Sequence, residues 1–241
     1  MKIRYFIVLL VLLLQFSCGK NKYRYGFFDG NWVEQSYLDT VVKYRSVYKA
    51  SALPFTELCF KRYVDSVYFI NLSGNVTAYA IENVAANRVH ILAKEQPNNL
   101  FFNRFSYEMF LGDSDSGDKF VSVDNLLVDS FSNIGIPSSR IFTIHSIVLG
   151  GIYKQPDNAI PIQFFVKGKI SGWDLYSGYE VCLTDADRKN FMGDVVLLTN
   201  TKTTDAYTWE WKDNSLKLTA LDIMDNTYKK SSRTFTFTKL K

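Results

Sequence analysis

This chain has few cysteine and histidine residues, whose side chains often act as nucleophiles, bases or metal ligands. The 241 residues include three cysteines, Cys18, Cys59 and Cys182, and two histidines, His90 and His145. The histidines are far apart in the sequence, and the cysteines lack the close spacing of a zinc site. The sequence therefore predicts no His-rich or Cys-rich metal site.

The sequence also lacks the short motifs that hold catalytic groups at fixed spacings. It contains no G-x-S-x-G, no H-E-x-x-H and no P-loop. A carboxylate pair for glycoside hydrolysis stays open, because two such residues need only be close in space. We expect that the protein is not an enzyme, and we predict no catalytic residue and no cofactor.

One acidic loop has part of the spacing of a calcium-binding loop. Asp113, Asp115 and Asp124 match positions 1, 3 and 12 of an EF-hand loop. Gly117 stands where a ligand is required, and Asp118 replaces the turn glycine. The interpretation that we favour is an acidic hairpin tip that binds no metal.

The N-terminal segment has the pattern of a secretory signal. Lys2 and Arg4 precede the apolar run Tyr5–Leu14, and Ser17 and Cys18 follow it. The run is half of the roughly 20 residues that a helix needs to span a bilayer. A cationic start, a short apolar region and a small residue before the cleavage point are typical of a signal peptide.

The junction Ser17-Cys18 resembles the lipobox of bacterial lipoproteins, in which the cysteine is acylated and becomes the new N-terminus. The resemblance implies a signal peptide at residues 1–17, a lipidated tether at 18–25 and membrane attachment through lipid on Cys18. The alternative is an ordinary signal peptide with an incidental cysteine.

The residues after Cys18 bear on the location. Gly19 replaces the aspartate that commonly retains Gram-negative lipoproteins in the inner membrane, so the resemblance implies the outer membrane. No acidic run follows Cys18. Because such a run resembles the surface-export signal of some bacteria, we expect the periplasmic face.

The mature chain is nearly balanced in charge. Removal of residues 1–17 leaves 26 basic against 24 acidic residues, a net charge of +2, and no block of Lys and Arg follows. Proteins that bind nucleic acid present a basic surface to its phosphates. No nucleic-acid partner is therefore predicted.

The aromatic content favours strands. The chain has 19 Phe and 15 Tyr, and such wide side chains pack well on a pleated surface. Candidate strands recur about every ten residues, as in an antiparallel meander, sandwich or barrel. The first four are Phe55–Tyr63, Ser66–Leu72, Val76–Glu82 and Arg88–Lys94. We predict an all-β fold of antiparallel strands.

Other segments give more specific expectations. Apolar residues spaced near 3.6 predict a short helix near residues 37–48. Leu100–Leu111 and Lys119–Val128 are expected to form the two strands of a long hairpin, and Ile141–Leu149 a mostly apolar strand. At the C-terminal end Tyr207, Trp209 and Trp211 alternate with polar residues, which predicts one buried and one solvated face.

Three features, in chain order, resemble the signature of the lipocalin family. Gly30 and Trp32 form a G-x-W motif, the segment Thr204–Tyr207 is similar to the T-D-Y turn of that family, and Arg233 begins the last strand. The resemblance implies that residues 26–241 form a single antiparallel β domain in which a meander closes into a lipocalin-like barrel. Trp32 would lie at the closed end, covered by Arg233, with the first and last strands paired. The alternative is a β-sandwich.

Two functions follow from these observations. The first is a lipid-anchored, lipocalin-like protein whose barrel holds a small apolar or amphipathic ligand, with ligand-binding residues that the sequence does not identify. The second is a structural or interaction lipoprotein with a filled core, whose protein partner is unknown and whose function lies in the loops 112–118, 130–140 or 150–161. Cys59 and Cys182 are predicted to be buried thiols that do not bridge.

Overall fold

The structure is a computed structural model of the 241-residue chain. It describes residues 26–53, 57–61, 64–72, 75–93, 99–112, 114–123, 139–156, 158–183, 193–224 and 227–240. The signal segment, the tether with Cys18, Asp113 and Asp124 lie outside the described residues. The predictions made for them stay predictions.

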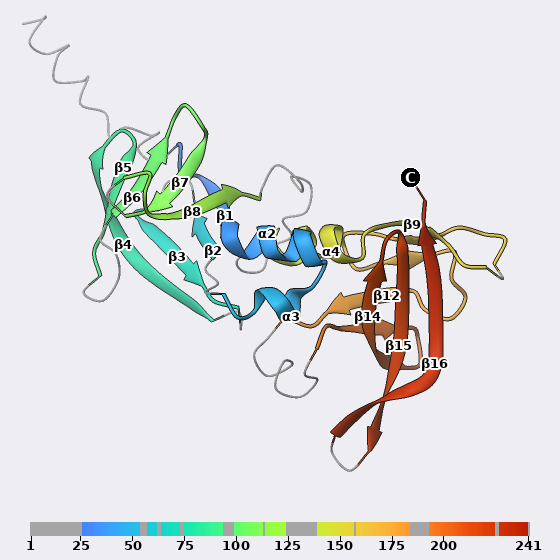
Figure 1. Cartoon of the computed structure of the whole chain (residues 1–241). Coiled ribbons are helices and arrows are strands. Elements are labelled where there is room, and N and C mark those ends of the chain that lie inside the picture. Colours follow the sequence, from blue (N-terminus) through green and yellow to red (C-terminus); the bar gives the residue numbers. More distant parts are fainter. Residues whose placement is uncertain are drawn as a thin grey trace, which may run out of the picture.

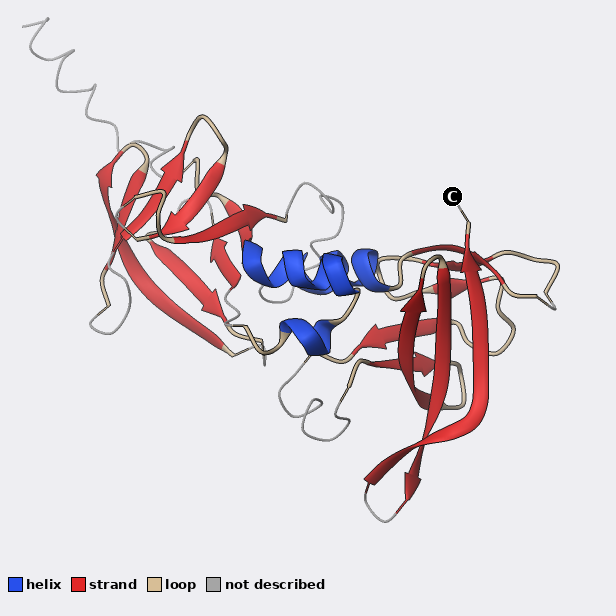
Figure 2. Cartoon of the chain, viewed as in Figure 1, coloured by secondary structure: helices blue, strands red, loops and turns tan. Residues whose placement is uncertain are grey.

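The described chain is mostly antiparallel β-structure, with 53% of residues in strands and 13% in helices. The all-β prediction is confirmed. Its described strands form two eight-stranded sheets, and Figure 2 shows the helices lying between these sheets. Each sheet has its own buried core within the part predicted as one domain at residues 26–241.

The first sheet is a closed barrel in which each strand pairs with its neighbours in the sequence (Figure 1). Its strands are β1 Gly30–Glu34, β2 Glu57–Phe60, β3 Ser66–Ile70, β4 Val76–Ala85, β5 Arg88–Ile91, β6 Asn99–Asn103, β7 Glu108–Leu111 and β8 Asp118–Ser122. The barrel closes because β8 returns to β1, with Trp32 opposite Ser122 and Glu34 opposite Phe120. Closure leaves no unpaired strand edge in this sheet.

Side chains fill the barrel. Twelve residues form this core, each at most 5% exposed: Phe28, Trp32, Leu58, Phe60, Val67, Ile81, Val89, Ile91, Leu100, Phe102, Met109 and Phe120. Strand alternation sends the Trp32 ring inward, whereas Val33 joins a different core on the outside of the barrel. β1 is therefore buried on both faces.

The segment 100–111 is two strands rather than the one expected. A turn at residues 104–107 separates β6 from β7, with Tyr107 in the left-handed region at φ 56°. The continuous aromatic pattern hid this turn, because it contains neither Gly nor Pro.

The predicted helix near residues 37–48 is present as two pieces. α2 spans Gln35–Tyr44 and α3 spans Val47–Ala50. Arg45 ends α2 in the left-handed conformation, and the Ser46 hydroxyl accepts a hydrogen bond from the Lys49 amide at the start of α3.

The prediction of a strand at Ile141–Leu149 is wrong, because Ser139–Val148 forms the helix α4. Ile144 and Val148 are fully buried and Ile141 is half-buried. These positions are three and four residues apart, so they lie on one helical face. The β-branched residues favoured a strand locally, and burial of this face overrides that preference.

The second sheet comprises the rest of the strands. They are β9 Gly151–Lys154, β10 Ile162–Phe164, β11 Ile170–Ser171, β12 Gly178–Val181, β13 Val195–Thr199, β14 Thr204–Lys212, β15 Ser215–Met224 and β16 Thr227–Lys239. Their order is β11-β10-β9-β16-β15-β14-β13-β12. The sheet curls until a bridge between Lys169 and Gly178 links the two edge strands.

The expected pairing of the first and last strands is wrong. β1 pairs with β2 and β8, and the last strand, β16, pairs with β15 and β9. The physical reason is that β8 already occupies the open edge of β1. The terminal strand therefore completes the second sheet.

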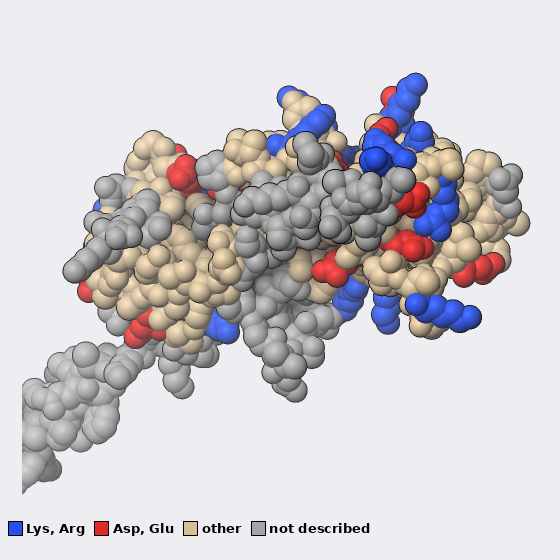
Figure 3. All heavy atoms as spheres, turned by 90° about the horizontal axis from the view of Figure 1, so that it is seen from below, with Lys and Arg blue, Asp and Glu red and all other residues tan. Residues whose placement is uncertain are grey.

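The helices pack into the core of the second sheet. Tyr37, Val41, Ile144 and Val148 are fully buried together with Phe237 and other residues of strands β9–β16. On the face seen in Figure 3, charged side chains gather over the second sheet, and the barrel presents mostly uncharged residues.

The prediction that Cys59 and Cys182 do not bridge is confirmed. Cys59 is buried in β2 of the barrel, as predicted, whereas Cys182, which follows β12 of the second sheet, is only half-buried. The two described cysteines form no disulfide bond with each other.

Replacement of Trp32 by alanine should destabilise the barrel by about 3–5 kcal/mol, because the ring fills a closed core. Chemical denaturation measures this loss. Phe105→Ala, at a side chain that is 99% exposed, is the matched control and should change stability by less than about 0.5 kcal/mol. A cost below about 1 kcal/mol for Trp32→Ala would contradict the packed interior.

Candidate functional site

Trp32, the tryptophan of the lipocalin-like G-x-W motif, is a core residue of the barrel. Its indole N–H donates to the backbone oxygen of Phe28 at 2.9 Å. Its ring meets Phe102 edge-on, with 5.9 Å between the ring centroids. Trp32 therefore anchors the segment by which the chain enters the barrel.

Arg233 does not cover Trp32, which corrects the sequence prediction. Its guanidinium carbon lies 5.4 Å from the centre of the Tyr207 ring, and its Nη1 lies 3.7 Å from Asp205 Oδ2. Asp205 and Tyr207 belong to β14 and Arg233 belongs to β16, and both strands are part of the second sheet. The structure thus brings Asp205, Tyr207 and Arg233 together, and it places Trp32 in the other sheet.

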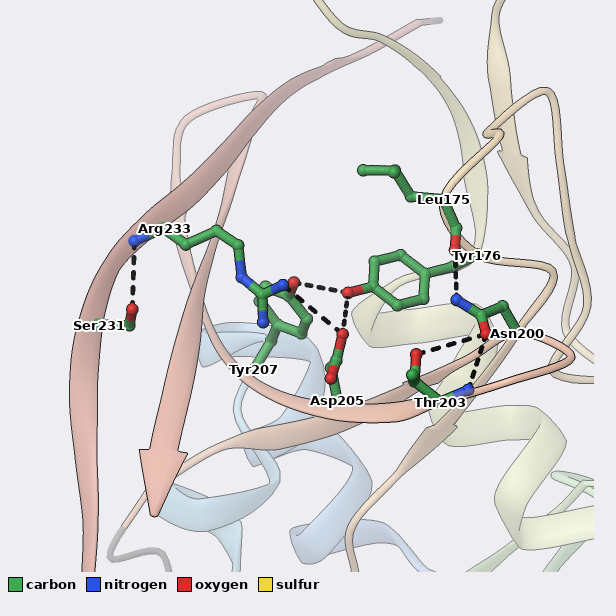
Figure 4. Close-up of polar contacts among 8 residues, drawn as sticks. All are labelled: Leu175, Tyr176, Asn200, Thr203, Asp205, Tyr207, Ser231 and Arg233. Carbon is green, nitrogen blue, oxygen red and sulfur yellow. Dashed lines mark hydrogen bonds and ion pairs between the residues drawn. The ribbon is translucent and has the colours of Figure 1, made fainter. Parts of the chain in front are cut away.

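Tyr176 completes this group, which we call the tyrosine cluster: Tyr176, Asp205, Tyr207 and Arg233 (Figure 4). The Tyr176 hydroxyl donates to Asp205 Oδ2 at 2.5 Å and lies 2.7 Å from the Tyr207 hydroxyl. A hydroxyl has one proton to donate. Since that of Tyr176 goes to the carboxylate, Tyr207 donates to Tyr176.

Aromatic rings close one side of the tyrosine cluster. Trp173 meets Tyr176 and Phe235 edge-on, each at 5.1 Å between ring centroids. Trp173 follows Gly172, whose φ of 73° suits glycine. Arg233 is half exposed, so one side of the cluster faces solvent and the other packs against aromatic rings.

The turn between β13 and β14 is fixed to the same region (Figure 4). Asn200 Oδ1 accepts from the backbone amides of Lys202 and Thr203, both at 2.8 Å, and Figure 4 shows the bond to Thr203. Its Nδ2 donates to the backbone oxygen of Leu175 at 3.0 Å. The residue before Tyr176 is therefore held against this turn.

The chemistry of the tyrosine cluster is that of a hydrogen-bonded brace. Burial raises the pKa of Tyr176, and its bonds to Asp205 and Tyr207 raise it further. Burial also raises the pKa of Tyr207. Both hydroxyls therefore keep their protons at neutral pH, and neither is activated as a nucleophile or a base.

A second group joins the helices to the second sheet, and no pattern in the sequence predicted it. The Arg45 guanidinium lies over the Trp211 ring at 4.0 Å from its centre. Trp209 Nε1–H donates to the Arg45 backbone oxygen, and Trp211 Nε1–H donates to that of Val148, each at 2.9 Å. The alternation Tyr207-Trp209-Trp211 predicted the buried face but not these partners.

Asp194 adds a further link at this joint. Its Oδ1 accepts from the Tyr48 amide at the start of α3, at 2.8 Å. Burial raises the pKa of Asp194, although its hydrogen bonds to Ser46 and to α3 amides act in the opposite direction. A carboxylate at a helix N-terminus satisfies amides that would otherwise lack partners.

The two histidines lie in different elements, α4 and β5. His145 is buried, with Nδ1–H donating to the backbone oxygen of Val166 and Nε2 accepting from the Val181 amide. Burial lowers the pKa of His145 to about 4. His90 lies 3.1 Å from Asn99 Oδ1. Within the described ranges, no group of three His, Cys, Asp or Glu residues is placed to hold a metal ion.

The predicted loops have different outcomes. Residues 112–117 connect β7 to β8, and Asp115 is exposed at this tip. The loop expected at 150–161 is partly wrong, because its first half forms β9. Most of the loop at 130–140 lies outside the described residues, and its last two residues begin α4.

Comparisons of the chain with protein-family models, with curated proteins and with solved structures found no match. Among the described helices, none has the length and apolar character needed to cross a bilayer.

His145 should make the protein less stable as the pH falls from about 6.5 to about 4. In that window the unfolded chain takes up a proton that the folded chain does not, so the loss is on the order of 3 kcal/mol. Denaturation at several pH values measures it. His145→Gln should lose this slope, whereas His90→Gln should keep it. Equal slopes in wild type and His145→Gln would contradict the buried neutral histidine.

Tyr176→Phe should lower stability by about 1–3 kcal/mol, because Asp205 and Tyr207 each lose a buried hydrogen-bond partner. Thermal or chemical denaturation gives the difference from wild type. Tyr107→Phe removes a hydroxyl from a side chain that is 74% exposed, and it should be neutral. If both variants were neutral, the tyrosine cluster would not brace the second sheet.

Proposed function

We propose that the mature chain is a lipid-anchored protein of the bacterial cell envelope that acts through its surface. Acyl chains on Cys18 hold it on the periplasmic face of the outer membrane. The support for the anchor is the short apolar run and the junction Ser17-Cys18. The support for this location is Gly19 and the lack of an acidic run after Cys18.

The packed barrel interior carries the second part of the proposal. The closed eight-stranded barrel fits a lipocalin-like fold, and such barrels can enclose one small ligand. Here the twelve inward side chains are at most 5% exposed, and Phe28, Trp32 and Phe102 are in contact with one another's rings or backbone. A filled interior favours an interaction protein over a carrier of an apolar ligand.

The electrostatics of the described residues support a non-enzymatic role. Among the described carboxyl groups, burial raises the pKa of Glu34 and of Asp194. Glu34 accepts a hydrogen bond from the Ser36 hydroxyl at the start of α2, and Asp194 accepts one from the Tyr48 amide of α3. The Asp194 carboxylate thus holds the start of α3, and the Glu34 carboxylate is bonded to the side chain of Ser36.

The intact mass of the protein purified from host membranes tests both parts together. We expect a denatured mass that begins at Cys18 and includes acyl chains, and a native mass with no additional small molecule. Cys18→Ala should lose the acyl mass and the membrane fractionation, and Cys59→Ala should keep both. Unchanged fractionation of Cys18→Ala would refute the anchor, and a retained small molecule would refute the filled barrel.

A further inference from the structure

The turn between β6 and β7 carries two aromatic side chains that are largely exposed, although the Tyr107 ring meets Phe102 edge-on. Phe105 is 99% exposed and Tyr107 is 74% exposed, and Arg104 between them and β6 is exposed as well. Scattered apolar residues are common on protein surfaces, but this four-residue turn carries two exposed aromatic side chains together with a cation.

This turn lies where the chain enters the barrel. The Arg104 guanidinium lies over the Phe27 ring at 4.5 Å from its centre, and Phe27 stacks on Phe102 at 5.5 Å. In an antiparallel meander, alternate connections lie at the same end. The start of β1, the β2–β3 connection and the β6–β7 turn therefore share one end, which we call the tether end.

The tether end lies opposite the end of the barrel from which α2 starts. α2 follows directly from the opposite end of β1, and the helices lie between the two sheets (Figure 1). The acidic tip with Asp115 and Asp118 also belongs to that opposite end, because it connects β7 to β8. The tether end itself carries Lys61 and Val64, with the acids Asp29 and Asp65.

The length of the tether keeps this end near the site of lipidation. Residues 18–25 span at most about 29 Å when fully extended. Their sequence, CGKNKYRY, contains three cations, two tyrosines and no acid. Tyr, Trp, Lys and Arg are the residues that favour the headgroup region, because their apolar bodies and polar tips match its two environments.

We infer that the tether end, through Phe105 and Tyr107, docks on the phospholipid leaflet that holds the anchor. The rings enter the headgroup region, and Arg104 meets lipid phosphates. The contact orients the barrel so that the start of α2 and the acidic tip point away from the membrane. This inference rests on the lipid anchor proposed above.

Photo-crosslinking in the acylated full-length protein tests the contact. Phe105→benzoylphenylalanine places the reactive group at the proposed contact and keeps an aromatic ring at an exposed site. Phe165→benzoylphenylalanine is the matched control, because Phe165 is 40% exposed and follows β10 of the second sheet. After illumination of host membranes, mass spectrometry reads the adduct on each peptide and the acyl chains on Cys18.

We expect a phospholipid adduct at residue 105 and background signal at residue 165. An acylated chain with equal lipid labelling at both positions would overturn the docking alone. An adduct at 105 to a second copy or to another protein, without lipid, would overturn it as well. Lipid labelling at 105 on a chain without acyl groups would refute the anchor on which this inference rests, and the absence of both would overturn both.

Discussion

The pairing of β8 with β1 is the constraint on which the rest of the structure depends. Three residue pairs, from Trp32–Ser122 to Glu34–Phe120, form this seam. It completes a barrel whose core consists of twelve buried side chains, from Phe28 to Phe120 in the sequence. The remaining strands can then pair only among themselves, and β16 pairs with β9. α2 follows β1 and packs into the core of the second sheet. The packed interior, the placement of Arg233 and the exposed tether end all follow from this division.

Local patterns in the sequence predicted elements better than they predicted partners. The period-2 alternation at Tyr207–Trp211 and the 3.6 spacing near residues 37–48 both correspond to observed elements. The strand predicted at Ile141–Leu149 failed because its β-branched residues mask an Ile144–Val148 helical face. Barrel closure at β8 was not predictable, since strand pairing depends on contacts distant in sequence that no local period reports.

The same limit applies to the candidate site. The lipocalin-like pattern selected Asp205, Tyr207 and Arg233, and the structure does bring them together. It assigned Arg233 to Trp32 because two signature residues were assumed to share one barrel. The Tyr176–Asp205 hydrogen bond and the Arg45–Trp211 contact each join residues at least 29 positions apart in the sequence. No sequence motif marks either pair. The sequence did not predict that Phe105 is exposed, because the turn at residues 104–107 interrupts a segment that was expected to be one strand.

Hydrogen–deuterium exchange at the barrel seam tests the central claim most directly. A closed, packed barrel predicts that peptides covering Gly30–Glu34 and Asp118–Ser122 exchange slowly and together, because their amides open only when the barrel unfolds. The turn at residues 104–107 should exchange within the shortest labelling time and serve as the internal reference. Seam peptides that exchange as fast as this turn, while β14 and β15 stay protected, would contradict closure of the barrel between β1 and β8.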